Sequence, residues 1–313
     1  LQPLPGIVTL PADVVVCQND TDQFDVVTDG GAYTFRWQTD NGTGGVTWTN
    51  LNNGGFFSGA FSTTLSFTAS NTLNGHLYRL ELTNPVTTCV SLSDEVEMTV
   101  NPLPVITAQP QNAETCVSGI GLIGVTTADP TDLFQWQINT GSGFSTISDG
   151  TGFFGTTTDT VAILDPSGLN GAQFRVIVFD AVTNCDSIST AATLTVTPEP
   201  TVPAAMVPID ICGLTSTALN GTVPANGIGA WSVAIQPAGA SSVVFVDGVN
   251  DPNTRVQVDA FGTYEFAWTI SNGSCTPVSA TVEVTYFDDP SPSQADAGGA
   301  DTLSFCGTAI NLN

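Results

Sequence analysis

The sequence repeats one pattern of marked residues, and this repetition restricts the fold more than any other feature does. The first copy runs from Cys17 to Cys89, and the second runs from Cys116 to Cys185. In both copies a tryptophan follows the first cysteine by 20 residues, and an arginine precedes the second cysteine by 10 residues. Only the middle of the pattern differs in length, by three residues, as expected where a surface loop absorbs a deletion. A repeat of roughly 95 to 100 residues, the usual size of one β-sandwich domain, predicts several such domains in this chain.

Within each copy, short segments alternate apolar and polar residues, which is the period of a half-buried β-strand. Thr34 to Thr39 and its counterpart Leu133 to Asn139 show this alternation, with Trp37 and Trp136 on the apolar face. Val46 to Asn50 and Gln173 to Phe179 are further predicted strands. Clusters of Gly, Asn and Asp, which tolerate the positive φ angles of tight turns, separate such segments. No window shows a sustained apolar period of 3.6 residues. The sequence therefore predicts an all-β fold of short strands.

Proline-rich joints divide the chain. Residues 1–11 and 100–110 share three prolines, a leucine and an isoleucine, all displaced by 99 positions. Prolines fix φ and disfavour helix in the preceding residue, so each joint should be short, extended and stiff. Leu1 then reads as the last residue of an earlier repeat. The predicted units are residues 1–101, 102–199, 200–287 and the truncated start of a fourth unit at 288–313.

The third unit belongs to a different subtype from the first two. It opens with Cys212 and carries a strand from Tyr264 to Ile270, in which aromatic and polar residues alternate. Tyr264, Phe266, Trp268 and Ile270 should share one face, so this segment is predicted to be a central core strand. The fourth unit begins with similar residues and is predicted to be of this same subtype.

The charge balance excludes several classes of partner. The chain has 29 acidic residues and four basic ones, all of them arginines, for a net charge of −25. Such a chain cannot neutralise nucleic-acid phosphates, and it should not bind an anionic membrane surface. Like charge of this size keeps a long exposed molecule soluble and unaggregated. No apolar run reaches the ~20 residues of a membrane span, so we expect no span in this segment.

The seven cysteines show no Cys-x-x-Cys spacing, and His76 is the single histidine, which does not indicate a zinc site. One cysteine lies near the start and one near the end of each repeat. This spacing indicates disulfides, and disulfides indicate an oxidising compartment outside the cytoplasm.

Particular motifs carry a resemblance to a known group of proteins. The first two units share a proline joint, Phe-x-Trp-Gln, Leu-Asn-Gly-x-x-Tyr/Phe-Arg and a second cysteine before the last strand. They resemble the immunoglobulin-like repeats of Bacteroidota surface proteins. The third unit has Gly-x-Gly-x-Trp-Ser and Trp-Thr-Ile-Ser-Asn-Gly-x-Cys, and it resembles the PKD-like repeats of the same proteins. Alternating runs of such units are similar to the long SprB-type adhesins of gliding Bacteroidota, exported by type IX secretion.

The resemblance implies tandem immunoglobulin-like and PKD-like β-sandwich domains arranged as an extended rod. It implies a stalk segment of a large secreted adhesin or filament at the bacterial cell surface, serving adhesion or gliding motility. The alternative is a spacer or carbohydrate-binding array of a secreted enzyme. The implied partners are surface glycans or other cell-surface components, together with neighbouring repeats of the same chain.

Repetition within these units leads us to predict disulfides inside each one, although sequence alone does not dictate connectivity. The first cysteine lies farther from the tryptophan than in antibody-type domains, so we expect the bridges near the sandwich edge, where they tie the chain ends together. Closing the first loop would stabilise its domain by roughly 4 kcal/mol in the chain-entropy model. The predicted pairs are Cys17–Cys89, Cys116–Cys185 and Cys212–Cys275, with Cys306 paired to a residue beyond position 313.

We predict no catalytic residues and no required cofactor. His76 has Ala172 at the equivalent position of the second copy, and no nucleophile elbow occurs in the sequence. Calcium is the one metal we consider, because loop carboxylates are the hard oxygen ligands that it prefers. The candidate ligands are Asp247, Asp251, Asp288 and Asp289. The alternative is that they are ordinary turn residues.

Two kinds of sugar site are also considered. Trp48, Phe56-Phe57 and Phe153-Phe154 lie outside the main core strands, where they could either form a glycan platform or cap the core. Bacteroidota attach O-glycans at Asp-Ser/Thr followed by an apolar residue. By that resemblance, the predicted O-glycosylation sites are Thr160, Ser187 and Thr302.

Overall fold

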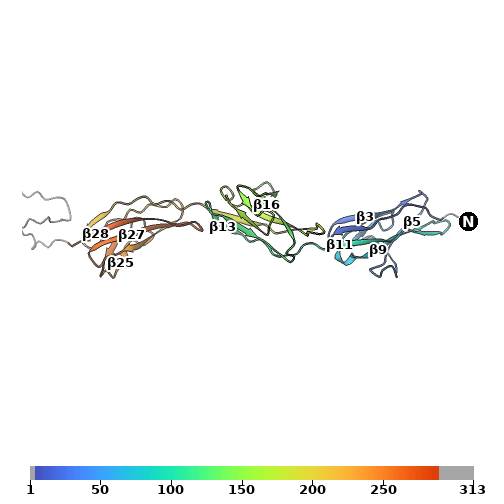
Figure 1. Cartoon of the computed structure of the whole chain (residues 1–313), viewed down its shortest axis with the longest axis horizontal. Helices are drawn as coiled ribbons and strands as arrows, with labels where there is room; N and C mark the ends of the chain where they lie inside the picture. The colour runs from blue at the N-terminus through green and yellow to red at the C-terminus, as the bar shows by residue number, and fades with distance from the viewer. Residues whose placement is uncertain (1–3, 289–313) are drawn as a thin grey trace, which may run out of the picture.

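The computed structural model describes residues 4–288, which form three β-sandwiches in a row (Figure 1). The first sandwich spans residues 7–101, the second 106–197 and the third 209–287. Within the described range the single helical element is the 3-10 turn η1 (Asn71–Leu73). The chain is thus an all-β rod of tandem immunoglobulin-like sandwiches. The strand periodicity predicted the all-β fold, and the resemblance implied the tandem sandwiches.

The first sandwich pairs a six-stranded sheet, in the order β2-β11-β9-β5-β6 with β10 also on β9, with a three-stranded sheet β3-β8-β7. A short β1-β4 pair forms a separate two-stranded sheet, and the strand order as a whole is that of an immunoglobulin domain. The strands are β1 (Ile7–Thr9), β2 (Val14–Cys17), β3 (Thr21–Asp25), β4 (Val27–Thr28), β5 (Thr34–Thr39), β6 (Thr49–Asn50), β7 (Phe57–Ser58), β8 (Thr64–Thr68), β9 (His76–Thr83), β10 (Val90–Leu92) and β11 (Val96–Asn101).

The second sandwich repeats this topology strand for strand, with sheets β13-β22-β20-β16-β17 and β14-β19-β18, the pair β12-β15, and β21 on β20. Its strands are β12 (Ile106–Ala108), β13 (Ala113–Cys116), β14 (Gly121–Gly124), β15 (Thr126–Thr127), β16 (Leu133–Asn139), β17 (Ser145–Thr146), β18 (Phe153–Phe154), β19 (Thr160–Ile163), β20 (Gln173–Phe179), β21 (Asp186–Ile188) and β22 (Ala192–Thr197).

The third sandwich has a simpler build, with a four-stranded sheet β23-β28-β27-β24 and a two-stranded sheet β25-β26. This difference agrees with the different subtype that its sequence indicated. Its strands are β23 (Ile209–Cys212), β24 (Ile228–Ile235), β25 (Val243–Phe245), β26 (Val256–Val258), β27 (Gly262–Ser271) and β28 (Val278–Phe287).

Each sandwich has its own hydrophobic core. Trp37 and Trp136 are completely buried at the centres of the first two cores, and no disulfide lies beside them. Both indole Nε1 groups donate to a backbone carbonyl, which satisfies the polar atom that burial would otherwise leave unpaired. In the third core, the four predicted face-sharing residues of β27 are all fully buried.

One predicted strand is shorter than expected. The sequence predicted a strand over Val46 to Asn50, but only Thr49–Asn50 is extended and paired. The preceding residues wrap around the buried carboxylate of Asp40, which accepts hydrogen bonds from the backbone N–H groups of Gly42, Gly45 and Leu77 at 2.8–3.0 Å. Burial alone would raise the pKa of Asp40, but these three donors hold it below its ordinary value. The turn is therefore built on a buried anion.

Candidate functional site: the joints between the sandwiches

The first cysteine of each unit lies where the chain leaves its sandwich. In the first sandwich, β2 and β11 are parallel neighbours, and Cys17 at the end of β2 is opposite Asn101 at the end of β11. The same register places Cys116 opposite Thr197 and Cys212 opposite Phe287. We call this end of each sandwich its C-terminal pole.

The second cysteine lies at the opposite end. Strand β9 starts at the C-terminal pole, where His76 pairs with Met98, and it ends where Thr83 pairs with Val90. Cys89 lies in the hairpin between β9 and β10. Cys185 lies in the equivalent β20–β21 hairpin, and Cys275 lies in the β27–β28 hairpin. We call this end of each sandwich its N-terminal pole.

The predicted disulfides within units are wrong, because the bridges join neighbouring sandwiches. Cys17 is bonded to Cys185 and Cys116 to Cys275, with Cα–Cα distances of 5.5 and 4.7 Å. The predicted Cys17–Cys89 and Cys116–Cys185 pairs would have to span a sandwich from pole to pole. An eight-residue strand such as β9 covers roughly 25 Å, whereas bonded cysteines have Cα atoms within about 7 Å.

The remaining cysteines follow from this arrangement. Cys275 is bonded to Cys116, so the predicted Cys212–Cys275 pair is also wrong, and Cys212 takes part in another disulfide. Cys89 is a free, partly exposed thiol. Cys306 and the predicted fourth unit lie outside the described residues, apart from Asp288.

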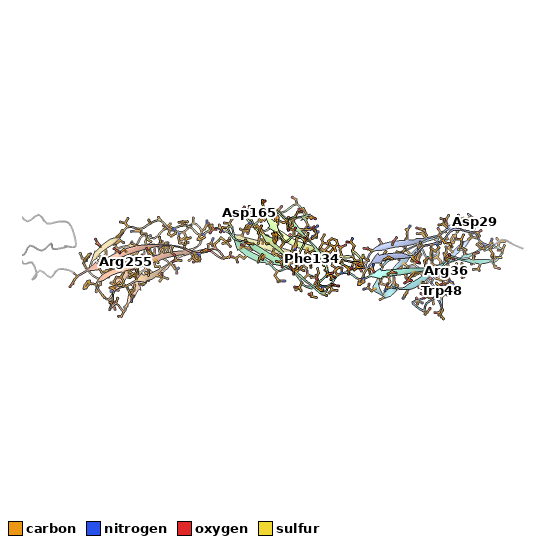
Figure 2. All side chains as sticks on the ribbon, in the orientation of Figure 1. Asp29, Arg36, Trp48, Phe134, Asp165 and Arg255 are labelled. Carbon is orange, nitrogen blue, oxygen red and sulfur yellow. A yellow bond between two sulfur atoms is a disulfide. The ribbon has the colours of Figure 1, made fainter. Side chains whose placement is uncertain are left out.

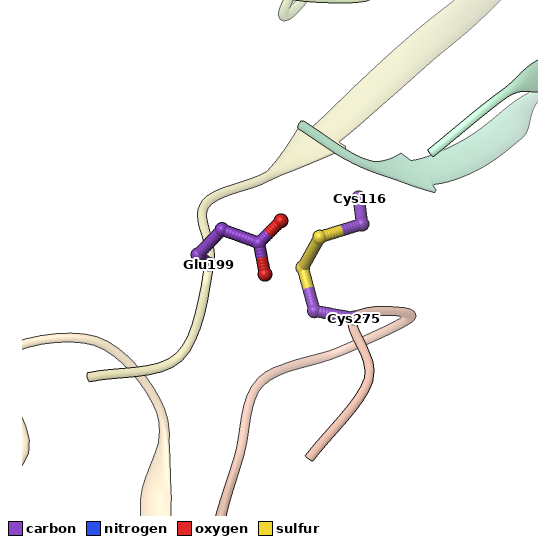
Figure 3. Close-up of side chains that lie close together, drawn as sticks. All are labelled: Cys116, Glu199 and Cys275. Carbon is purple, nitrogen blue, oxygen red and sulfur yellow. A yellow bond between two sulfur atoms is a disulfide. The ribbon is translucent and has the colours of Figure 1, made fainter. Parts of the chain in front are cut away.

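The joint between the second and third sandwiches brings three potential ligand side chains together. The carboxylate of Glu199 and the sulfurs of Cys116 and Cys275 lie within 4.8 Å of one another (Figure 3). The sulfurs belong to one disulfide and carry no thiolate, which is the form that binds a metal. This cluster is therefore a covalent joint with an acidic neighbour.

Close contacts between the hairpin tip and the end of the second sandwich reinforce this joint. The Asn272 side chain donates a 2.7 Å hydrogen bond from Nδ2 to the carbonyl of Pro198. Gly273 has φ +48°, and a Cβ there would lie 2.7 Å from the Glu114 carboxylate and 3.0 Å from Thr197. Only glycine fits this approach without displacement.

The joint between the first and second sandwiches has fewer contacts. The Ser187 hydroxyl donates to the carbonyl of Pro104 at 2.8 Å, which holds the linker against the second sandwich. Among residues 4–288, no hydrogen bond joins 7–101 directly to 106–197. Besides the linker, the Cys17–Cys185 bridge is thus the bonded connection that residues 4–288 show across this joint.

Three of the four arginines stack on aromatic rings of their own sandwich. The Arg79 guanidinium lies 4.0 Å from the ring centre of Trp48 and donates to Gln38 Oε1 at 2.8 Å. Arg175 repeats this arrangement in the second sandwich, 4.1 Å from Phe144 and 2.8 Å from Gln137. Arg36 lies over Phe61 at 4.5 Å. These arginines stabilise the sheet surface through cation–π contacts.

The aromatic residues considered for a glycan platform have separate roles. Trp48 is covered by Arg79, while Phe57 and Phe153 pack against the cores. Phe56 and Phe154 are 45% and 65% exposed. The backbone bonds Gly54–Phe57 and Gly150–Phe153 align the two loops, and in this alignment the exposed rings do not fall at equivalent positions.

Figure 2 shows side chains on successive sandwiches along the rod, with Arg36 and Trp48 on the first, Phe134 and Asp165 on the second and Arg255 on the third.

The calcium candidates are engaged in local contacts. Asp247 forms a two-pronged ion pair with Arg255, at 2.9 and 3.0 Å, and the hydrogen bonds from Arg255 lower the pKa of Asp247 to about 2. Asp251 accepts from the backbone N–H of Asn253 at 2.8 Å in a turn. Asp288 is exposed, and Asp289 lies outside the described residues. Calcium binding stays a prediction, which calorimetric titration of chelator-treated protein would test.

The O-glycosylation candidates differ in their surroundings. Thr160 is exposed at the start of β19, while the hydroxyl of Ser187 is occupied by its bond to Pro104. Thr302 lies outside the described residues. His76 is half-buried at the start of β9. Glycosylation stays a prediction, and the intact mass of the protein from its natural source would test it.

Sequence reasoning missed the joints as the site, although one signal was present. The first and last strands of many immunoglobulin-like sandwiches run parallel, so a cysteine ending the first core strand lies beside the chain exit. A cysteine after the long strand before the last one lies at the other pole. Strand direction, which the folded sandwich supplies and the sequence spacing does not, is what directs the bridge to the next unit.

No protein-family model and no curated protein matches this sequence. Among solved structures, a three-domain immunoglobulin fragment of titin is 12% identical, with 92% of this chain and 100% of that chain covered and a TM-score of 0.44. Extracellular domains 3–5 of Drosophila OTK are 12% identical, with 92% and 98% covered and a TM-score of 0.40. Immunoglobulin domains 1–5 of Sidekick-1 are 15% identical, with 91% and 59% covered and a TM-score of 0.33. The fold assignment rests on the strand order described above. Among residues 4–288, no helix is long and apolar enough to span a membrane.

Proposed function

We propose that this chain is a stalk segment of a secreted bacterial surface protein, in which disulfides between neighbouring sandwiches keep a long rod stiff. The observation that carries this proposal is the direction of both bridges. Each one joins the C-terminal pole of one sandwich to the N-terminal pole of the next. The function is mechanical: to hold whatever the rod carries at a distance from the cell.

The stiffness follows from having two covalent connections at each joint. Cys17 and Asn101 lie side by side at the C-terminal pole, so the bridge and the linker leave the first sandwich as neighbours. A single linker permits both bending and twisting. A second connection beside it restricts both, while the proline-rich linker keeps the joint short.

The composition supports an extracellular location. Disulfides persist in oxidising compartments and are rare in the cytosol. The charge of −25 makes neighbouring rods repel one another and keeps an extended molecule soluble. Adhesion or gliding motility at the cell surface, after export by type IX secretion, is the use that we propose for this rod on the sequence resemblance.

A distance measurement tests the stiffness. Spin labels on non-canonical residues at Val27 and Val244, which are 52% and 49% exposed, report the separation of the first and third sandwiches without using cysteine chemistry. We expect a narrow distance distribution in the oxidised chain and a broad one after reduction, while the circular dichroism of the sandwiches is unchanged. An identical distribution in both states would contradict the proposal.

Adhesion needs a separate test in cells. Cells that display the full-length parent protein should attach under shear. The double variant Cys17→Ser with Cys185→Ser should attach less well at the same surface density. Equal attachment of both strains would leave the rod as a passive spacer.

A further inference from the structure

The free thiol of Cys89 occupies a position that is bonded in both other sandwiches. Cys185 and Cys275, at the same N-terminal pole, are each bonded to the strand-end cysteine of the preceding sandwich. Cys89 is the free cysteine of the described range. Two equivalent cysteines of this chain thus show what this position binds.

The hairpin that holds Cys89 has the same geometry as the hairpin that holds Cys185. The N–H of Asn84 donates to the carbonyl of Cys89 at 3.0 Å, and the N–H of Asp180 donates to that of Cys185 at 2.9 Å. The residue before the cysteine has positive φ in both, 56° at Thr88 and 60° at Asn184. The thiol of Cys89 is therefore presented in the position that forms the bridge in the second sandwich.

The chain also enters both sandwiches along the same path. Ser91 donates to the carbonyl of Pro5 at 2.8 Å, as Ser187 does to that of Pro104 at 2.8 Å. One residue later, the carbonyl of Gly6 accepts from Asp29, as that of Val105 accepts from Ala128. The linker that enters the first sandwich therefore follows the same path as the linker at the first joint, where that path leads from the preceding sandwich.

The first sandwich differs from the second in what covers this pole. Cys185 is 1% exposed, whereas Cys89 is partly exposed. Leu4 is 65% exposed, whereas its counterpart Leu103 is partly covered. The N-terminal pole of the first sandwich thus has the cysteine position and the linker path of a joint, together with an exposed apolar residue, Leu4.

We infer that the N-terminal pole of the first sandwich is a docking site for the C-terminal pole of another sandwich of this kind, and that Cys89 forms a disulfide with its strand-end cysteine. This inference rests on the bridged rod proposed above. The partner must present a cysteine at the end of its first core strand, beside the end of its last strand, as Cys17 is presented beside Asn101.

The bond forms by thiol–disulfide exchange with a disulfide oxidant such as oxidised glutathione. The partner cysteine first forms a mixed disulfide with glutathione and releases one glutathione thiol. The Cys89 thiolate then attacks the partner's sulfur, and the second glutathione leaves as its thiolate. Two protein thiols and one glutathione disulfide thus give one protein disulfide and two glutathione thiols.

The test adds a sandwich in front of the full chain. A second copy of residues 1–99 is fused before Leu1, so that Leu1 to Pro5 take the place that residues 100–104 have at the first joint. The added copy carries Cys89→Ser, which leaves a single Cys89 in the protein. After folding in a glutathione redox buffer, free thiols are alkylated, and the disulfides are mapped by mass spectrometry.

We expect Cys89 bonded to Cys17 of the added copy, with alkylation of Cys89 reduced about tenfold or more relative to the unfused chain, because a short linker brings the two thiols to mM effective concentration. The control fusion has Cys17→Ser in the added copy and should leave Cys89 fully alkylated. The inference is overturned by an alkylated Cys89, or by Cys89 dimers between molecules, in a fusion that retains Cys17–Cys185. If Cys17–Cys185 is missing from the same map, the bridged rod itself fails.

Discussion

The two joints of the rod use the same bridge but rely on it to different degrees. At the first joint, between two sandwiches of one subtype, the Cys17–Cys185 bridge and the linker are the main connections. At the second joint, the Asn272 side chain also donates a hydrogen bond to the carbonyl of Pro198, and Gly273 packs against the side chains of Glu114 and Thr197. The third sandwich has a different topology, and the two strands of its hairpin, β27 and β28, are longer. Its bridge nevertheless connects the same two poles. The difference indicates that the bridge is the constant part of a joint and that the surrounding contacts vary with subtype.

The largest expected effect concerns the length of the chain under force. The two bridges overlap in sequence, because Cys116 lies between Cys17 and Cys185. From residue 4 to residue 288, the shortest covalent path runs from 4 to Cys17, from Cys185 back to Cys116, and from Cys275 to 288. These three stretches have 13, 69 and 13 residue steps, 95 in total, against 284 without bridges. Full extension should reach roughly 330 Å in the oxidised chain and roughly 1,000 Å in the reduced chain, as measured by single-molecule pulling.

Because the bridges overlap, either bridge alone should limit the full extension of the chain almost as strongly as both together. With Cys17–Cys185 alone the path is 13 and 103 steps, and with Cys116–Cys275 alone it is 112 and 13 steps. The two single-bridge variants should therefore extend by similar amounts, far short of the reduced chain. A single-bridge variant that extends as far as the reduced chain would refute the observed connectivity.

The second prediction separates the two joints. Replacing both cysteines of one bridge by serine should loosen the first joint more than the second, because the second joint retains its Asn272 and Gly273 contacts. Small-angle X-ray scattering should show a larger change in maximum dimension for Cys17→Ser with Cys185→Ser than for Cys116→Ser with Cys275→Ser. Equal changes would mean that the additional contacts contribute nothing to stiffness.

The third prediction concerns the close approach at the second joint. Gly273→Ala should strain the backbone by about 1–2 kcal/mol, and the ends of the Glu114 and Thr197 side chains must move aside for its methyl group. If opening relieves the whole backbone strain, this joint should open about 5- to 30-fold more often. Reduction of Cys116–Cys275 by dithiothreitol should then be faster, with Cys17–Cys185 in the same molecule as the internal reference. Gly239→Ala is the matched control, since Gly239 has φ +95° but no neighbour within 4 Å. An equal effect of both variants on the bridge would remove the role given to close packing.

The smallest expected effect lies away from both joints. The pKa of Asp247 is lowered to about 2 by Arg255, so this ion pair stabilises the third sandwich above the ordinary carboxyl pKa of 3.8 and is lost as the pH falls toward 2. Both side chains are partly exposed, so salt should weaken the pair. Between pH 5 and pH 2 the melting temperature of the third sandwich should fall less in Asp247→Asn than in the unmodified chain. The reduction rates of both bridges should be the same in the two proteins, whereas a change would tie the joints to this charge pair.

Much of the fold could be predicted from short-range pattern. Alternation with period two identified Thr34–Thr39, Leu133–Asn139 and Gln173–Phe179 at their observed bounds. The buried face of β27 followed from the same period. This succeeds because a half-buried strand requires apolar residues at every second position, wherever the strand lies in the fold. The strand predicted over Val46 to Asn50 failed because a buried carboxylate, Asp40, organises that loop from several residues away.

The pairing of the cysteines was beyond what the sequence by itself determined. A repeat offers the same spacing whether a cysteine bonds within its unit or with the next unit, so Cys17 had two equivalent partners in Cys89 and Cys185. The tertiary structure decided between them, because the parallel pairing of β2 with β11 places Cys17 a whole strand length away from Cys89. The sequence determined the sandwiches through local periodicity. Only their folded arrangement brought the poles of neighbouring sandwiches together, since a disulfide requires two sulfur atoms to meet in space.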